Sequence, residues 1–274
     1  MERWQVLSVL SAFTVAAAVL VPKLESLTDD DTPAQAPAIN AAPMPSPGLT
    51  LASTHHTPTQ APERAAEDLG MLNIRAGLDL PFRALSYAAP DGLAVTYTSA
   101  DFLRIRHDID DTEALTAFDR ALAAALAGLD STATRPVPVD GLSVNHGILE
   151  LRSPHDVAES VARLRRIVKA QSDTVWFGDI DFAAEAAAQG VDLPPAVLLL
   201  FGGPAPGGVA MAQFPSIGVD AFCQKLLVYA HPDGGSVVIY NSITALAELH
   251  YGASAPPHQL LDERLTATFV KALE

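Results

Sequence analysis

The sequence predicts an α+β fold in which a small sheet carries helices packed on it. A full domain and a half-domain repeat form one composite body, which an N-terminal transmembrane helix precedes. Segments of strand and helix period alternate after residue 147. The skeleton of "YAAPDGLAVTYTSADFLRIRH" at Tyr87–His107 returns in "YAHPDGGSVVIYNSITALAELH" at Tyr229–His250. An uncharged stretch near the amino terminus completes the prediction.

The composition excludes several classes of function. The chain has 274 residues, with 32 Asp plus Glu against 17 Lys plus Arg and a net charge of −15. Nucleic-acid binding needs clustered cations, so no nucleic-acid partner is expected. The single cysteine, Cys223, rules out an intramolecular disulfide within the chain. An acidic surface also fits a basic soluble partner, such as an electron carrier.

Residues 1–22 are predicted to be a membrane anchor. The stretch "WQVLSVLSAFTVAAAVLV" at 4–21 carries no charge and approaches the roughly 20 residues that span a bilayer. A cleaved signal peptide is the alternative, but no small-x-small site stands where a peptidase would cut. We therefore expect a single-pass protein of a bacterial inner membrane, in contact with lipid through 4–21. The N-terminus would be cytoplasmic and the globular part periplasmic.

Residues 23–66 are predicted to form a linker. "TPAQAPAINAAPMPSPG" and "STHHTPTQAPER" are rich in Pro, Ala, Ser and Thr and have no hydrophobic period. A coil of this length would reach on the order of 35 Å. The globular part would thus be held near the membrane but free to meet a partner.

Residues 147–274 are predicted to form the full domain. Ser153 is the predicted N-cap of its first helix, because Pro154 and an acid follow it. "AVLLLFGG" is fully apolar and predicts an interior strand, whereas Pro-Asp-Gly-Gly predicts a hairpin turn. The expected strands are 147–153, 174–182, 196–203 and two within 224–241, and the later helices are 183–190, 243–249 and 259–273.

Residues 67–130 are predicted to be a degenerate half-copy of that domain. They repeat its hairpin and its last two helices, and Asp119 stands at the position of Asp262. No strand–helix–strand precedes the hairpin, so the half-copy should pack on the full domain to cover its apolar faces. Residues 131–146 would connect the two.

The stretch Gly147–Leu273 resembles the domain-of-unknown-function family 302. "GDIDFAAEAAAQGVDLPP", "VLLLFGGPAPGGVAM" and "KLLVYAHPDGGSVVIYNSITALAELH" carry the resemblance. "LDLPFRALSYAAPDG" in the half-copy resembles the rear half of the same family. The resemblance implies a small α+β fold with a tendency to dimerise, and no reaction. It also implies that the half-copy imitates the second protomer of such a dimer.

His107 and His250 are the candidate site residues. Each ends a short helix of the repeat, where an imidazole can meet unpaired carbonyl groups. This structural interpretation is favoured. The alternative is that the two histidines, related by the repeat, converge on a metal or a haem iron.

No catalytic residue and no cofactor are predicted. The glycine-rich "FGGPAPGGVAM" lacks the phosphate-loop and dinucleotide spacings. "RHDIDDTE" lacks the spacing of a calcium loop, and Asp110 with Glu113 suggests a capping box instead. Motifs of serine hydrolases, zinc proteases and redox dithiols are missing from the sequence, which favours a protein that is not an enzyme.

The expected function is therefore that of a membrane-anchored, periplasm-facing, non-enzymatic accessory or scaffold protein. It would dock on a larger membrane complex, for example a respiratory or photosynthetic one. The alternative is a small-molecule, haem or metal-binding domain that uses His107 and His250.

Overall fold

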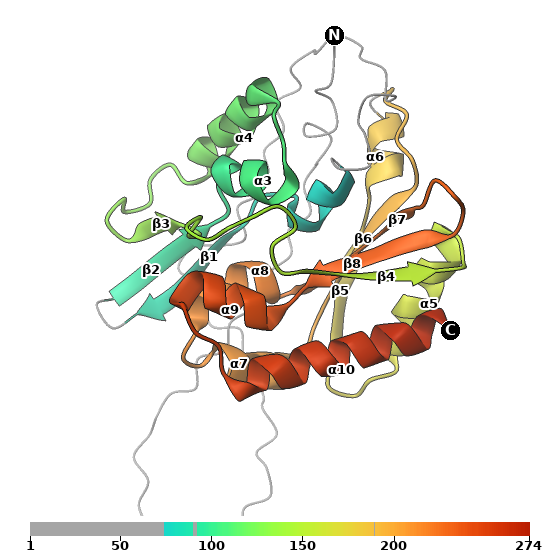
Figure 1. Cartoon of the computed structure of the whole chain (residues 1–274). Coiled ribbons are helices and arrows are strands. Elements are labelled where there is room, and N and C mark those ends of the chain that lie inside the picture. Colours follow the sequence, from blue (N-terminus) through green and yellow to red (C-terminus); the bar gives the residue numbers. More distant parts are fainter. Residues whose placement is uncertain (1–73, 90–91, 189) are drawn as a thin grey trace, which may run out of the picture.

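The computed structural model describes residues 74–89, 92–188 and 190–274 (Figure 1). The strands are β1 Ala84–Ala89, β2 Gly92–Tyr97, β3 Thr134–Pro136, β4 Ile148–Ser153, β5 Val175–Asp181, β6 Ala196–Gly202, β7 Gln224–Ala230 and β8 Ser236–Asn241. The helices are η2 Arg75–Asp79, α3 Ala100–His107, α4 Thr112–Ala125, α5 Val157–Lys169, α6 Phe182–Ala188, α7 Pro204–Met211, η3 Pro215–Ile217, α8 Gly218–Ala221, α9 Ile243–Tyr251 and α10 Pro256–Leu273. The α+β prediction is confirmed.

The larger sheet is antiparallel and has the strand order β4-β8-β7-β6-β5. Successive side chains of its strands point to opposite faces, and both faces are buried. Leu226 and Val228 pack against α5 and α10, whereas Leu227 and Tyr229 face η2 and the α3–α4 pair. Burial on both sides explains the continuous apolar run of β6, an interior strand as predicted.

The smaller sheet has the order β1-β2-β3. Its hairpin has the same register as the hairpin of the larger sheet. Tyr97 lies opposite Ala84, as Tyr240 lies opposite Leu226. β3 falls within the predicted connection 131–146 and pairs with β2 in parallel, so this segment extends the sheet rather than merely linking two parts.

The two sheets share one hydrophobic core. Phe102, Leu103 and Phe118 from the α3–α4 pair belong to the same buried cluster as Leu198 and Ile239 from the larger sheet. η2 packs against β7, and α8 packs against β1. The two parts therefore bury each other's apolar faces.

The helices that follow the two hairpins begin in the same way. The Ser99 hydroxyl accepts a hydrogen bond from the Phe102 N–H, and the Ser242 hydroxyl accepts one from the Ala245 N–H. A carboxylate of the next helix supports each start. Asp262 accepts from the amides of Ile243 and Thr244 and from the Ser242 hydroxyl, at 2.7, 3.1 and 2.8 Å. Asp119 accepts from the Ala100 amide at 3.3 Å.

Two predicted N-caps lie at the wrong residue. α5 is capped by Asp156, which accepts from the Glu159 N–H, because the hydroxyl of Ser153 is 2.8 Å from that of Ser160. α4 is capped by Asp111, which accepts from the Glu113 N–H, rather than by Asp110.

None of the helices in the ranges described is both long enough and apolar enough to cross a bilayer. The predicted anchor at 4–21, the linker at 23–66 and residues 67–73 of the predicted half-copy lie outside the described residues.

We expect Asp262→Ala to lower the free energy of unfolding by about 2 kcal/mol, because it leaves two helix-start amides without their partner. Asp119→Ala, which removes one long hydrogen bond, should cost less than about 1 kcal/mol. Urea unfolding followed by circular dichroism measures both values. Equal costs for the two variants would contradict this difference.

Candidate functional site

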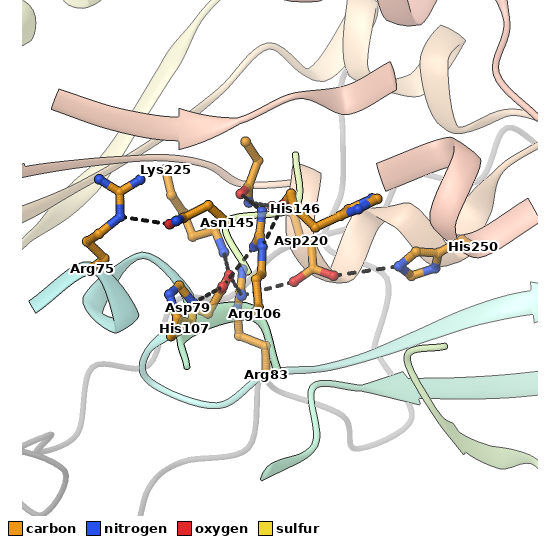
Figure 2. A network of polar contacts seen from close by, with 11 residues as sticks. Arg75, Asp79, Arg83, Arg106, His107, Asn145, His146, Asp220, Lys225 and His250 are labelled. Carbon is orange, nitrogen blue, oxygen red and sulfur yellow. Dashed lines mark hydrogen bonds and ion pairs between the residues drawn. The ribbon is translucent and has the colours of Figure 1, made fainter. Parts of the chain in front are cut away.

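A cluster of buried charged side chains lies where the two sheets meet (Figure 2). Its centre is Asp79 at the end of η2, which has no exposed surface. One oxygen of Asp79 accepts from Arg106 and contacts the His107 Nε2, both at 2.7 Å. The other accepts from the Lys225 Nζ at 3.2 Å and from Arg83 at 3.3 Å. One carboxylate thus holds η2, α3, β7 and the segment before β1 together.

A second buried carboxylate, Asp220 of α8, extends the cluster. Arg83 bridges the two acids, since its Nη2 also donates to Asp220 at 3.0 Å. Arg106 donates to the side chain of Asn241 at 2.8 Å, and Asn241 donates to the backbone carbonyl of Asp220. Arg83 directly precedes β1, and Lys225 is the second residue of β7. Each lies two residues before its member of the aligned pair Leu85 and Leu227, so equivalent places in the two hairpins supply both cations.

The charges of this cluster keep one another ionised. Burial alone raises the pKa of Asp79, but Arg106, Lys225 and the His107 hydrogen bond outweigh it and hold that pKa well below its usual value. The pKa of Asp220 is lowered in the same way by His250, Arg83 and Lys225, against the effect of burial. Burial and the neighbouring Arg83 lower the pKa of Lys225 to about 8, although the two carboxylates favour its charged form.

His107 lies inside this cluster. Its Nε2 contacts Asp79, and its Nδ1 is buried without a hydrogen-bond partner. The predicted contact with helix-end carbonyls is absent from the hydrogen bonds described for this ring, because Asp79 offers a stronger, charged acceptor. Burial, together with the nearby charges of Arg106 and Arg75, lowers the pKa of His107 despite the opposing effect of Asp79.

His250 has a different environment. Its side chain is 1% exposed, and its Nε2 lies 3.6 Å from the Asp220 Oδ2. Its Nδ1 lies 2.9 Å from the Ser216 hydroxyl, which belongs to η3. Each predicted histidine therefore has its own carboxylate partner, Asp79 or Asp220. The described residues contain no group of three or more His, Cys, Asp or Glu that could hold a metal ion, and metal or haem ligation stays a prediction.

A groove of about 790 Å³ opens beside His250. It runs along the smaller sheet, with the ends of η3 and α9 forming one wall. Ser216, His250 and Tyr251 lie in that wall, and Leu93 and Arg135 lie on the sheet side. Leu93 and Tyr251 are 54% and 40% exposed, so apolar side chains face the open groove.

Sequence reasoning found the two histidines but missed Asp79, Arg83, Arg106, Asp220, Lys225 and Ser216. Arg83 and Asp79 are four residues apart, but the bonds of Arg83 to Asp220 and of Lys225 to Asp79 span 137 and 146 residues, so no local motif marks the whole cluster. The repeat carried one usable signal, because it places Arg83 and Lys225 at equivalent positions at the start of the two hairpins.

Residues 149–269 match the family described as "Domain of unknown function DUF302". This part of the chain is a DUF302 domain. The crystal structure of an uncharacterized conserved DUF302 protein from Bacillus stearothermophilus aligns with a TM-score of 0.38 and 17% sequence identity. The alignment covers 46% of this chain and 95% of that one.

Fluoride-specific ion channels of Brucella are also similar to the chain. Fluoride-specific ion channel FluC 1 of Brucella suis biovar 1 (strain 1330) is 35% identical over 109 residues, which are 39% of this chain and 41% of that protein. FluC 1 of Brucella abortus biovar 1 (strain 9-941) is 35% identical over 109 residues, 39% of each chain. The chain therefore spans about two fifths of the length of these curated relatives.

We expect Asp79→Asn to lower the free energy of unfolding by about 3–5 kcal/mol, because it leaves three buried cations short of a counter-charge. Asp173→Asn is the matched control. It breaks the half-exposed pair with Arg264 and should cost less than about 1 kcal/mol. Urea unfolding measures both, and a cost for Asp79→Asn as small as that of the control would contradict a central role for this carboxylate.

Stability should also fall as the pH drops below 7. The pKa of folded His107 lies below its ordinary 6.5, so the unfolded chain binds more protons in that window and the free energy of unfolding decreases toward pH 5. His107→Gln keeps an N–H donor for Asp79 but cannot titrate. Its free energy of unfolding should change less between pH 7 and pH 5 than that of the wild type. Identical changes in urea unfolding would show that His107 does not contribute.

Proposed function

We propose that this chain is a membrane-tethered accessory protein that docks on a larger membrane protein complex through the groove of its smaller sheet. The observation that carries the proposal is the groove itself, with the exposed side chains of Leu93 and Tyr251 beside an uncharged stretch of β2. Exposed apolar side chains that line a groove are typical of protein interaction sites.

The buried charge cluster favours a groove whose walls are rigid. Its cations and carboxylates pair with one another across the junction of the two sheets, and their side chains are at most 12% exposed. Because these charged side chains bind one another, they hold the two sheets in one relative orientation. The groove, one wall of which belongs to each part, then keeps a fixed shape for its partner.

The relatives suggest the kind of partner. A stretch of 109 residues is similar to part of a fluoride-specific ion channel, which is a membrane protein. We propose that the uncharged residues 4–21 hold this chain at a bacterial inner membrane, with residues 74–274 on the periplasmic side. The partner would then be a membrane channel or a complex of comparable kind. The net charge of −15 leaves a basic soluble protein as a further candidate partner.

We also infer that residues 67–130 descend from the rear half of the DUF302 domain. The matched register of the two hairpins, the serine caps Ser99 and Ser242 and the supporting carboxylates Asp119 and Asp262 favour this origin. Duplication would explain the groove. Residues 74–83 contain η2 before the first hairpin, whereas the full domain has β4, β5 and β6 and the helices α5, α6, α7, η3 and α8 before its own hairpin.

The test is fractionation of native membranes in mild detergent, with mass spectrometry of each size fraction. We expect the wild-type chain to migrate with a large membrane complex. Leu93→Asp places a charge in the groove and should reduce the complex-bound fraction on the order of tenfold or more. Leu260→Asp is the control, because Leu260 is 65% exposed on α10 and does not line the groove.

Migration of the wild-type chain as a lone monomer or dimer would overturn the proposal. Equal losses for Leu93→Asp and Leu260→Asp would show that docking does not use the groove.

A further inference from the structure

Three side chains form a continuous line from the groove into the charge cluster. The Ser216 hydroxyl lies 2.9 Å from the Nδ1 of His250, whose other ring nitrogen lies 3.6 Å from the Oδ2 of Asp220. η3, α9 and α8 supply one residue each. Figure 2 shows the His250 ring and the Asp220 carboxylate facing each other. A hydroxyl, an imidazole and a carboxylate in this order are the components of nucleophilic serine catalysis.

The two inner atoms of this line have no other partners. Both the His250 Nε2 and the Asp220 Oδ2 are buried without a hydrogen bond. The carboxylate favours the ring proton on the Nε2 that faces it, which leaves Nδ1 as an acceptor for the Ser216 proton. Asp220 is held in place by Arg83 at its other oxygen. The carboxylate would stabilise a positive charge that arises on the imidazole during a reaction.

His107 provides a comparison within the same molecule. It also faces a carboxylate, Asp79, but its second nitrogen is buried and has no partner. His250 instead reaches a half-buried serine in the wall of the groove. Of these two histidines, His250 alone has both a nucleophile and access for a substrate.

We propose that Ser216, with His250 as its base and Asp220 as a positioning residue, is a nucleophilic site for carboxylic esters that carry an apolar acyl group. The groove of about 790 Å³ has room for a small ligand, and Leu93, Ala94 and Leu129 give its lining an apolar character. This activity goes beyond the proposed docking function and does not require it.

The reaction divides into two balanced steps. The Ser216 Oγ bonds to the ester carbonyl carbon while its proton passes to the His250 Nδ1. The C–O bond to the alcohol then breaks, and the alcohol leaves with that proton. Water next attacks the acyl group on Ser216 and gives a proton to His250. The carboxylic acid is released as Ser216 recovers its proton.

Tyr251 is placed to assist at the carbonyl oxygen. Its hydroxyl oxygen accepts a hydrogen bond from the Ser216 N–H at 2.9 Å and another from the Ser216 hydroxyl at 2.8 Å, so its own proton is free to point elsewhere. A phenol hydroxyl next to the attacking oxygen can donate to the negative charge that develops on the ester. Removing one such donor typically costs about 10²–10³ in rate where the donor is fully engaged.

The first experiment incubates the full chain with a fluorophosphonate probe and locates the adduct by peptide mass spectrometry. We expect the label on Ser216 in the wild type and none on that peptide in Ser216→Ala. Hydrolysis of p-nitrophenyl butyrate should fall at least 100-fold in Ser216→Ala and His250→Asn, and at least tenfold in Tyr251→Phe. Asp220→Asn should lower kcat and leave KM within twofold, a division that a merely loosened fold would not give.

Ser254→Ala is the matched control, because this serine pairs with Glu248 on the surface and does not line the groove. It should keep both labelling and hydrolysis. Circular dichroism checks that each variant is folded. An unlabelled Ser216 in the folded wild type would overturn the proposal, as would hydrolysis that persists in Ser216→Ala.

Discussion

The carboxylate of Asp79 is the point on which the architecture depends. It is buried at the junction of the two sheets and receives Arg83, Arg106, His107 and Lys225, which come from segments on both sides of the junction. A buried carboxylate is tolerable only when its charge is compensated and its lone pairs are used. The charges of Arg83, Arg106 and Lys225 are likewise tolerable because Asp79 and Asp220 are present. The cluster therefore holds η2, α3, β1 and β7 in one relative arrangement.

The cluster also determines the character of the groove. Arg83 ties Asp220 to Asp79, and Asp220 faces His250 in the groove wall. A wall with this support presents its polar groups at fixed positions. Chemistry at Ser216 and docking through Leu93 would both depend on this rigidity, because both use the same groove.

The two sheets differ in how their faces are covered, and this difference leaves the groove open. In the full DUF302 domain, helices α5 and α10 cover the face of the sheet that carries Leu226 and Val228. The smaller sheet is instead hollowed where Tyr87, Ala94 and Arg135 lie. Leu85 and Tyr97 of this hairpin pack against the core shared with the larger sheet, so one part of the hairpin is covered and another lines the groove.

The sequence by itself determined the α+β class, the two hairpins, and the order of helices after each. These features depend on periodicity and turn chemistry within a few residues, so they can be predicted from short stretches of sequence. The N-caps Asp156 and Asp111 could not be predicted in this way, because neighbouring residues are equally good acceptors and only the packing of the fold decides between them. The tertiary structure alone decided the charge cluster and the line from Ser216 to Asp220. Their members are far apart along the chain, and an Asp or a Ser gives no sign of its partner until the sheets have packed.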